Sequence, residues 1–151
     1  MMLTKMTRFG TRAVFDIAYN SSGLPVQVKD IAKRQELPLK FLEQIFNKLK
    51  KADFIKSQRG KHGGYVLTKD PREITVGDIV RAVDEQFDLV CCVSDTKTCS
   101  RAGPCPTRPV WEETSRRVQE YLDTVTIADL CEDAKNKGVE KDTSHPFDYT
   151  I

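Results

Sequence analysis

The sequence predicts a mainly α-helical protein with one small β-hairpin, and three observations support this fold class. Residues 28–51 contain two helical patterns separated by a tight break. Two short β-like runs follow in residues 54–68, around a basic, glycine-rich tip. Residues 109–124 then carry apolar side chains mostly at steps of three and four, as an amphipathic helix does. In this order the elements predict a winged helix-turn-helix domain plus a long C-terminal dimerisation helix.

Composition and charge narrow the class of protein. A chain of 151 residues with 39% hydrophobic and 30% charged residues suits one domain with a modest core. No apolar run approaches the ~20 residues of a membrane span, and the N-terminus has no apolar signal core, so we expect a cytoplasmic protein. Residues 1–70 have a net charge of +8 and residues 71–151 a net charge of −6. This division is typical of a nucleic-acid-binding part joined to a regulatory or oligomerising part, although unevenly spread surface charge would also produce it.

The patterns divide the chain into four parts. Residues 1–84 form the winged helix-turn-helix DNA-binding domain, and residues 85–107 form a cysteine-rich loop. Residues 108–136 form the dimerisation helix and a short packing helix. Residues 137–151 have no periodicity and are expected to be a disordered tail.

The helix-turn-helix is predicted from apolar spacing. A largely buried helix is expected over Thr7–Asn20, and a short helix over Val28–Glu36. Pro38 fits the first turn of the next helix, where its missing N–H does no harm. That helix has a strong amphipathic pattern, with apolar residues at Leu39, Leu42, Ile45, Phe46 and Leu49.

A β-hairpin is predicted next, with strands over Phe54–Ser57 and Tyr65–Thr68. The residues between them, 58–64, are QRGKHGG. A mobile surface loop would have the same composition. The helix-turn-helix directly upstream favours the other interpretation, a wing that contacts DNA.

The C-terminal part is predicted to be helical. A capping box at Thr75 opens a helix that runs to Val83, and a second at Thr126 opens a short last helix. Between them, the helix Pro109–Thr124 needs a covering partner for its apolar stripe, which consists of Trp111, Val118, Leu122 and Val125. A second copy of the chain is the economical partner, because two-fold dimers are the commonest oligomers. The alternative is that the stripe packs on its own domain.

Seven side chains are predicted to contact double-stranded DNA. Gln can form a bidentate bond to adenine, Glu can accept from the cytosine amino group, and basic residues hold phosphates or enter the minor groove. For any single lysine, an ordinary surface charge is equally expected. The candidates on the recognition helix and the wing are Lys40, Phe41, Glu43, Gln44, Lys48, Arg59 and Lys61.

Four of the five cysteines lie within fifteen residues, in a segment whose composition predicts a loop without regular structure. Zinc sites usually use a C-x2-C pair, whereas Cys92, Cys99 and Cys105 are spaced more widely. That spacing favours an iron–sulfur cluster over zinc. Free thiols or a redox pair remain alternatives. Cys131 lies in an apolar helical pattern and is expected in the core.

Several motifs together resemble the Rrf2 family of bacterial winged-helix regulators. The resemblance runs from about residue 3 to residue 130, with every element in order. It is carried by RFGTRAVFDIA, DIAKRQELPLKFLEQIFNKLKKADFI, RGKHGGYVL, ITVGDIVRAVDE, the three-cysteine loop, TRPVWEE and TIADL.

This resemblance implies a homodimer joined by its long helices and bound to a palindromic operator. It also implies a 2Fe-2S or 4Fe-4S cluster held by Cys92, Cys99 and Cys105. By position, the family's DNA contacts fall on four residues, and the site that discriminates between operator types in one branch falls on Glu43. The four are Lys40, Phe41, Gln44 and Arg59.

The sequence departs from one branch of that family at the fourth ligand. The histidine of that branch, three residues after the last cysteine, is here Arg108, which cannot bind a metal. Asp95, Cys91 or a residue of the other subunit's N-terminal helix could replace it.

Our functional hypothesis is a transcriptional regulator, expected to be a repressor, whose cluster senses iron–sulfur status, redox or nitric oxide. The alternative is a cofactor-free or zinc-binding regulator that acts by protein–protein contact or thiol redox. No His/Cys or carboxylate pair is placed for acid–base catalysis and no phosphate-binding glycine motif occurs, so we do not expect an enzyme.

Overall fold

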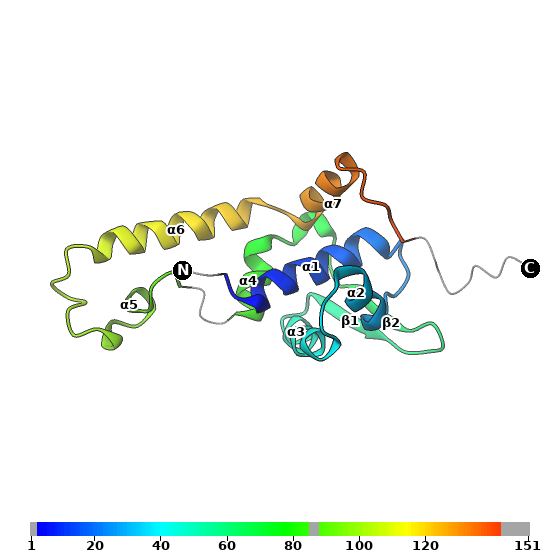
Figure 1. Ribbon diagram of the computed structural model, residues 1–151, viewed down its shortest axis with the longest axis horizontal. Helices are drawn as coiled ribbons and strands as arrows, with labels where there is room; N and C mark the ends of the chain where they lie inside the picture. Colours follow the sequence, from blue (N-terminus) through cyan, green and yellow to red (C-terminus); the bar gives the residue numbers. More distant parts are fainter. Residues whose placement is uncertain (1–2, 85–87, 143–151) are drawn as a thin grey trace, which may run out of the picture.

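The structure is a computed structural model that describes residues 3–84 and 88–142. It confirms the predicted class, a mostly helical protein with a two-stranded antiparallel hairpin. Figure 1 shows a body containing α1–α4, the hairpin and α7, from which α6 extends, with the cysteine segment beside its far end. The elements in chain order are α1 (Lys5–Asn20), α2 (Val28–Gln35), α3 (Leu39–Lys51), β1 (Ile55–Gln58), β2 (Gly64–Leu67), η1 (Pro71–Glu73), α4 (Val76–Val83), α5 (Cys91–Ser94), η2 (Thr96–Thr98), α6 (Arg108–Thr124) and α7 (Ile127–Asn136).

The core is built around α1, which contacts α2, α3, α4 and α7. Its side chains Ala13, Val14 and Ile17 are completely buried, as the predicted apolar face requires. Burial of such side chains is the main source of the stability of the body. Helices α2, α3, α4 and α7 contribute apolar residues to the same cluster, including Ile31, Leu42, Ile45, Leu49, Ile79 and Ile127.

The predicted helix-turn-helix is formed by α2 and α3. The residue that caps the C-terminus of α2 is Glu36, whose left-handed backbone (φ 53°) reverses the chain. The N–H of Leu37 donates to the Ala32 carbonyl at 2.9 Å, and the Leu37 side chain is buried. Pro38 takes the position directly before α3. The turn is therefore fixed both by backbone conformation and by burial of one leucine.

The predicted hairpin is confirmed. β1 lies one residue later in the chain than expected, and β2 lies one residue earlier. β1 and β2 pair antiparallel, from Ile55 opposite Leu67 to Gln58 opposite Gly64. Val26 forms an isolated antiparallel bridge with Tyr65 of β2, with backbone hydrogen bonds of 2.9 and 2.8 Å. The hairpin is thus attached to the chain segment that enters the helix-turn-helix.

Both predicted capping boxes are present, at Thr75/Asp78 and Thr126/Asp129. The two threonines also lie opposite each other in an isolated antiparallel bridge. Hydrogen bonds to the Asp129 carboxylate, first from the Thr126 backbone N–H, hold its pKa below the usual range. The bridge fixes the starts of α4 and α7 against each other.

The long helix expected over Pro109–Thr124 is observed as α6. Within this helix, which is described in full, only Ser115 is buried. Val110, Trp111 and Tyr121 are large apolar side chains that remain exposed. Of the predicted stripe, Trp111 is exposed, whereas Val118, Leu122 and Val125 are half-buried. α6 thus packs partly on α4 and leaves the side with Val110, Trp111 and Tyr121 exposed.

The C-terminal segment differs from the expected disordered tail in its described part. The Tyr19 hydroxyl donates to the Val139 carbonyl at 2.7 Å, and Arg34 lies 2.6 Å from the Asp142 carboxylate. Residues as far as 142 therefore contact α1 and α2. Residues 143–151 of the expected tail lie outside the described residues.

Candidate DNA interface and cysteine segment

The N-terminal half of α3 presents polar side chains to solvent. Lys40, Glu43 and Gln44 are exposed, because the apolar positions of this amphipathic helix face the core. Phe41 is half-buried, and its ring packs edge-on against Phe9 of α1, with the ring centroids 5.5 Å apart. Phe41 thus anchors the start of α3, while Lys40, Glu43 and Gln44 remain at the surface.

The tip of the hairpin exposes two cations, Arg59 and Lys61. Its backbone is tight: Gly60 has φ +129°, and a Cβ on Gly63 would lie 2.3 Å from the Gln58 carbonyl oxygen. These glycines permit a turn that L side chains would prevent. The tip is therefore a compact loop with both cations at the surface, as a DNA-contacting wing requires.

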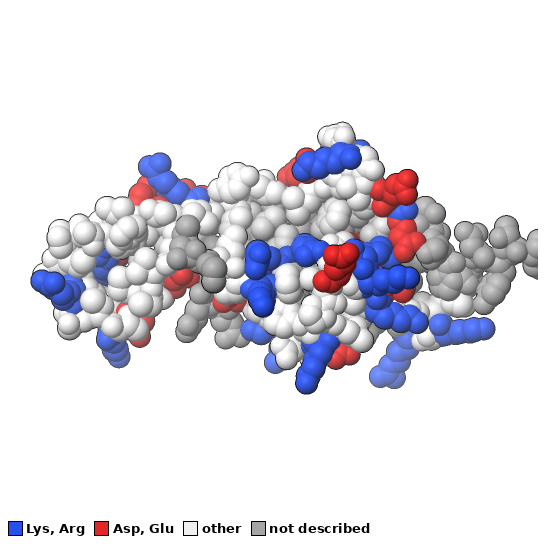
Figure 2. Space-filling view, in the orientation of Figure 1, with Lys and Arg blue, Asp and Glu red and all other residues white. Residues whose placement is uncertain are grey.

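Positive charge gathers on the helix-turn-helix part of the molecule. On the face shown in Figure 2, Lys and Arg are concentrated where Figure 1 places α1–α3 and the hairpin. Because a phosphate backbone is attracted by clustered cations, this surface suits nucleic acid.

Lys48 lies in different surroundings from the other six predicted DNA contacts. It is half-buried, and its Nζ donates to the carbonyl oxygen of Val83 at the end of α4, at 3.1 Å. Its ammonium group thus already has a partner within the body. Sequence spacing could not have shown this contact, since the two residues are 35 positions apart.

The cysteine segment contains more regular structure than its composition predicted, namely the short helices α5 and η2. Cys92, Cys99 and Cys105 are half-buried and Cys91 is exposed, all as free thiols. Local capping explains η2: the Asp95 carboxylate accepts the Lys97 N–H at 2.9 Å. A four-residue helix such as α5 has too short a pattern to be recognised in a sequence.

Cys105 lies three residues before α6, where hydrogen-bond donors surround its thiol. Its Sγ lies 3.2 Å from the Thr107 hydroxyl oxygen. The Thr107 hydroxyl, together with the backbone N–H groups of Thr107 and Arg108, lowers the pKa of this thiol below its ordinary value. Thiolates are the form that binds metals and reacts with oxidants, so this position favours both.

The three predicted ligands are not gathered in this structure. In residues 3–84 and 88–142, no group of three or more His, Cys, Asp or Glu side chains is placed to hold one metal ion. The chemistry of the donor set still fits a cluster, because three soft thiols come from one exposed segment. Binding a cluster would require this segment to bring Cys92, Cys99 and Cys105 together.

Arg108, at the position of the missing histidine, begins α6. Its guanidinium pairs with Glu112 one turn along the helix, at 3.0 Å. Its Nε is buried and has no hydrogen-bond partner among the described residues. Arg108 therefore keeps one buried N–H without a partner in that part of the chain, and its always-protonated guanidinium cannot serve as a metal ligand.

Cys131 lies apart from the other thiols. It packs against the hydrophobic core, as predicted, and burial raises the pKa of its thiol. This thiol is therefore less suited to metal or redox chemistry than that of Cys105.

Comparisons with known proteins agree with this architecture. A family model, Rrf2, described as an iron-dependent transcriptional regulator, matches residues 3–133. The chain is 42% identical to Protein rrf2 of Nitratidesulfovibrio vulgaris over 134 residues, covering 89% of each protein. IscR of T. potens has a similar structure, with a TM-score of 0.73, 35% identity and 94% of each chain covered. CymR, the global cysteine regulator of B. subtilis, also gives a TM-score of 0.73, with 31% identity, 88% of this chain and 98% of CymR covered.

Proposed function

Because the chain belongs to the Rrf2 family of transcriptional regulators, we propose that it binds a palindromic operator as a homodimer, under control of an iron–sulfur cluster. The family is not one of enzymes. The observation that carries the proposal is the place of the cysteine segment. It joins the end of α4, in the DNA-binding body, to the start of α6, the helix with the exposed apolar side chains Val110, Trp111 and Tyr121.

The proposed DNA interface consists of α3 and the hairpin tip. Glu43 and Gln44 are exposed near the start of α3 and can read base edges in the major groove. Lys40, Arg59 and Lys61 hold phosphates or reach the adjacent minor groove. Phe41 contributes chiefly through its packing on Phe9, which fixes the angle of the recognition helix.

The proposed cluster is held by Cys92, Cys99 and Cys105, and is either 2Fe-2S or 4Fe-4S. When bound, it supplies a centre whose oxidation, loss or reaction with nitric oxide changes the order of the cysteine segment. Support comes from the thiol donor set, and from relatives that are described as iron-dependent or named IscR. The fourth ligand is open between Asp95, Cys91 and a residue of the partner subunit.

The proposed dimer forms along α6. Val110, Trp111 and Tyr121 give this helix an exposed apolar surface, which a second copy would cover. A two-fold dimer carries two recognition helices, and so matches an operator with two related half-sites. None of the described helices is both long and apolar enough to cross a membrane. We place the regulator, as a repressor, in the cytoplasm with its DNA.

A second candidate mechanism is thiol redox without a cofactor. It is favoured by Cys105, whose lowered pKa suits reaction with oxidants. S. aureus CymR, whose oxidized form has been solved, is similar to the chain with a TM-score of 0.72 and 26% identity. Zinc bound by the same cysteines is the remaining variant of this mechanism.

Purification under nitrogen separates these mechanisms. Iron, acid-labile sulfide and zinc are measured in the wild type, in Cys99→Ala and in Cys131→Ala. If the cysteines bind a cluster, the wild-type protein should be brown and contain iron and sulfide. Both should be lost in Cys99→Ala and retained in the core variant Cys131→Ala. Colourless protein that contains zinc, or no metal, would contradict it.

A further inference from the structure

Lys48 connects the recognition helix to the end of α4. Its Nζ donates to the carbonyl oxygen of Val83, the last residue of α4, at 3.1 Å. The last carbonyls of a helix lack intrahelical partners and carry partial negative charge. A lysine ammonium is well suited to this position, and the half-buried side chain lies between two helices instead of extending into solvent.

The same end of α4 is attached to α1. Asp84 directly follows Val83, and its carboxylate accepts from the hydroxyls of Thr4 at 2.8 Å and Thr7 at 3.4 Å. Thr4 is also the N-cap of α1. The point where the chain leaves the body towards the cysteine segment is thus held by both α1 and α3.

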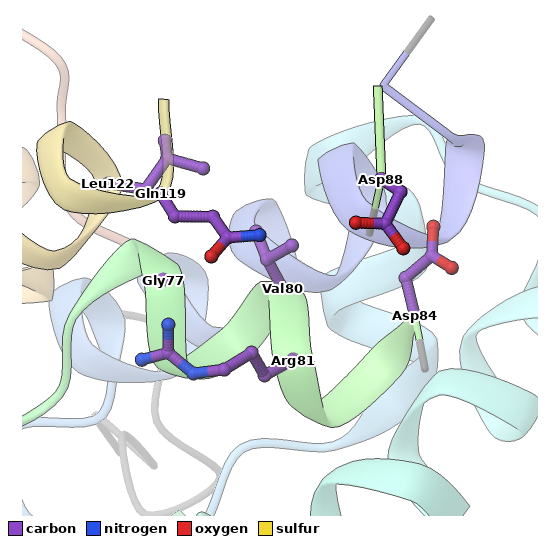
Figure 3. A pocket seen from close by; sticks show the side chains of 7 residues that line it. All are labelled: Gly77, Val80, Arg81, Asp84, Asp88, Gln119 and Leu122. Carbon is purple, nitrogen blue, oxygen red and sulfur yellow. The ribbon is translucent and has the colours of Figure 1, made fainter. Parts of the chain in front are cut away.

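The other side of α4 is attached to α6. Arg81 donates to Asp123 of α6 at 2.8 Å and to Asp78 at 3.1 Å. The two helices approach so closely that a Cβ on Gly77 would lie 1.9 Å from the Asp123 carboxylate. Figure 3 shows Gly77 and Arg81 on α4 beside Gln119 and Leu122 of α6. A shift of α6 would therefore alter its contacts with α4.

We propose that Lys48 is a positioning residue that transmits the state of the cysteine segment to the recognition helix, and that it does not contact DNA phosphate. The segment is connected to α4 at one end and to α6 at the other, and Lys48 adds a polar contact between α4 and α3 to their packing in the core. This inference rests on the proposed function, because it requires that the cluster state changes DNA affinity. Lys48 acts through Val83 and touches neither cluster nor DNA.

The first arm of the test distinguishes transmission from phosphate contact. The probe is a DNA duplex selected by the wild-type protein from a random pool, and affinity is measured by fluorescence anisotropy over a range of salt concentrations. The Lys40→Met variant, at a predicted DNA contact, should reduce the slope of log affinity against log salt by about 0.9 for each lost phosphate contact. Lys48→Met should leave the slope at the wild-type value. An equal loss of slope in Lys48→Met would overturn the proposal.

The second arm measures the ratio of affinities between cluster-loaded and chelator-stripped protein. In Lys48→Met this ratio should move several-fold towards one, whereas Lys48→Arg, which keeps a cationic donor, should retain most of the wild-type ratio. If Lys48 has only a structural role, Lys48→Met should weaken DNA binding equally in the loaded and the stripped protein and leave the ratio unchanged. That result would overturn the transmitting role of Lys48 but not control by the cluster. A wild-type ratio of one would overturn control by the cluster, and the role of Lys48 with it.

Discussion

Arg34 of α2 forms a two-pronged contact with the completely buried carboxylate of Asp16 in α1, with N···O distances of 2.6 and 3.1 Å. Gln35 adds a third donor at 2.9 Å. This charged contact joins the central helix to the first helix of the helix-turn-helix. It lies within the DNA-binding body, so it bears on the stability of that body.

Arg34→Met is expected to destabilise the protein by about 3–5 kcal/mol, because it leaves a buried carboxylate without its cation. Denaturant unfolding of the metal-free protein measures this change. The matched control is Arg72→Met, which removes an exposed pair with Asp70 and should leave the unfolding free energy close to that of the wild type. Equal losses of unfolding free energy in the two variants would show that the Arg34–Asp16 pair stabilises the protein no more than an exposed pair does.

Gly64→Ala is expected to displace the hairpin from the segment before α2. The added Cβ would lie 2.5 Å from the Val26 carbonyl oxygen and 2.7 Å from the Val26 carbonyl carbon, and neither backbone atom can move alone. We expect a loss of about 1–3 kcal/mol in unfolding free energy, as for other overpacked sites. Gly103→Ala, where a Cβ would meet nothing within 4 Å, should change stability by less than about 0.5 kcal/mol. A Gly64→Ala variant as stable as the wild type would contradict the Val26 contact.

In metal-free protein, Cys105 is expected to be alkylated by iodoacetamide at lower pH than Cys131. A lowered pKa keeps the Cys105 thiol ionised to lower pH, whereas burial raises the pKa of Cys131. Mass spectrometry of the two peptides over a pH series gives both profiles from one sample. Thr107→Val removes the hydroxyl that contributes most to the lowered pKa, and should move only the Cys105 profile to higher pH. Coincident profiles in the wild type would refute the activation of Cys105.

Tyr121→Lys is expected to weaken the proposed dimer, because it places a charge on the exposed apolar side of α6. Glu120→Lys introduces the same residue one position earlier, where the side chain pairs with Arg116 away from the stripe. Sedimentation velocity should show a larger monomer fraction for Tyr121→Lys than for Glu120→Lys. Equal monomer fractions in the two variants would mean that the side of α6 with Tyr121 is not the dimer interface.

Much of the fold could be predicted because it depends on local patterns. The spacing of Leu42, Ile45 and Leu49 defines α3, and the Thr75 and Thr126 capping boxes define where α4 and α7 begin. Each signal lies within a few residues of the structure it determines.

Other features could not be predicted, because they join residues far apart in the sequence. Lys48 was expected at the DNA surface, but its partner Val83 is brought close only by the packing of α3 on α4. Asp142 contacts Arg34, which lies 108 positions earlier in the chain. No local pattern in the sequence could therefore predict that the segment after α7 is ordered. The spacing of Cys92, Cys99 and Cys105 identifies three possible ligands, but it does not show in which conformation of the segment their thiols come together.

The most direct test of cluster control is the affinity of the wild-type protein for the selected DNA duplex, measured at one salt concentration before and after the cluster is removed under nitrogen. We expect a change of at least about tenfold, a coupling of about 1.4 kcal/mol. A triple variant with Cys92, Cys99 and Cys105 replaced by Ala should give one affinity under both treatments, equal to that of the stripped wild type. Equal affinities of loaded and stripped wild-type protein would contradict control of DNA binding by the cysteine segment.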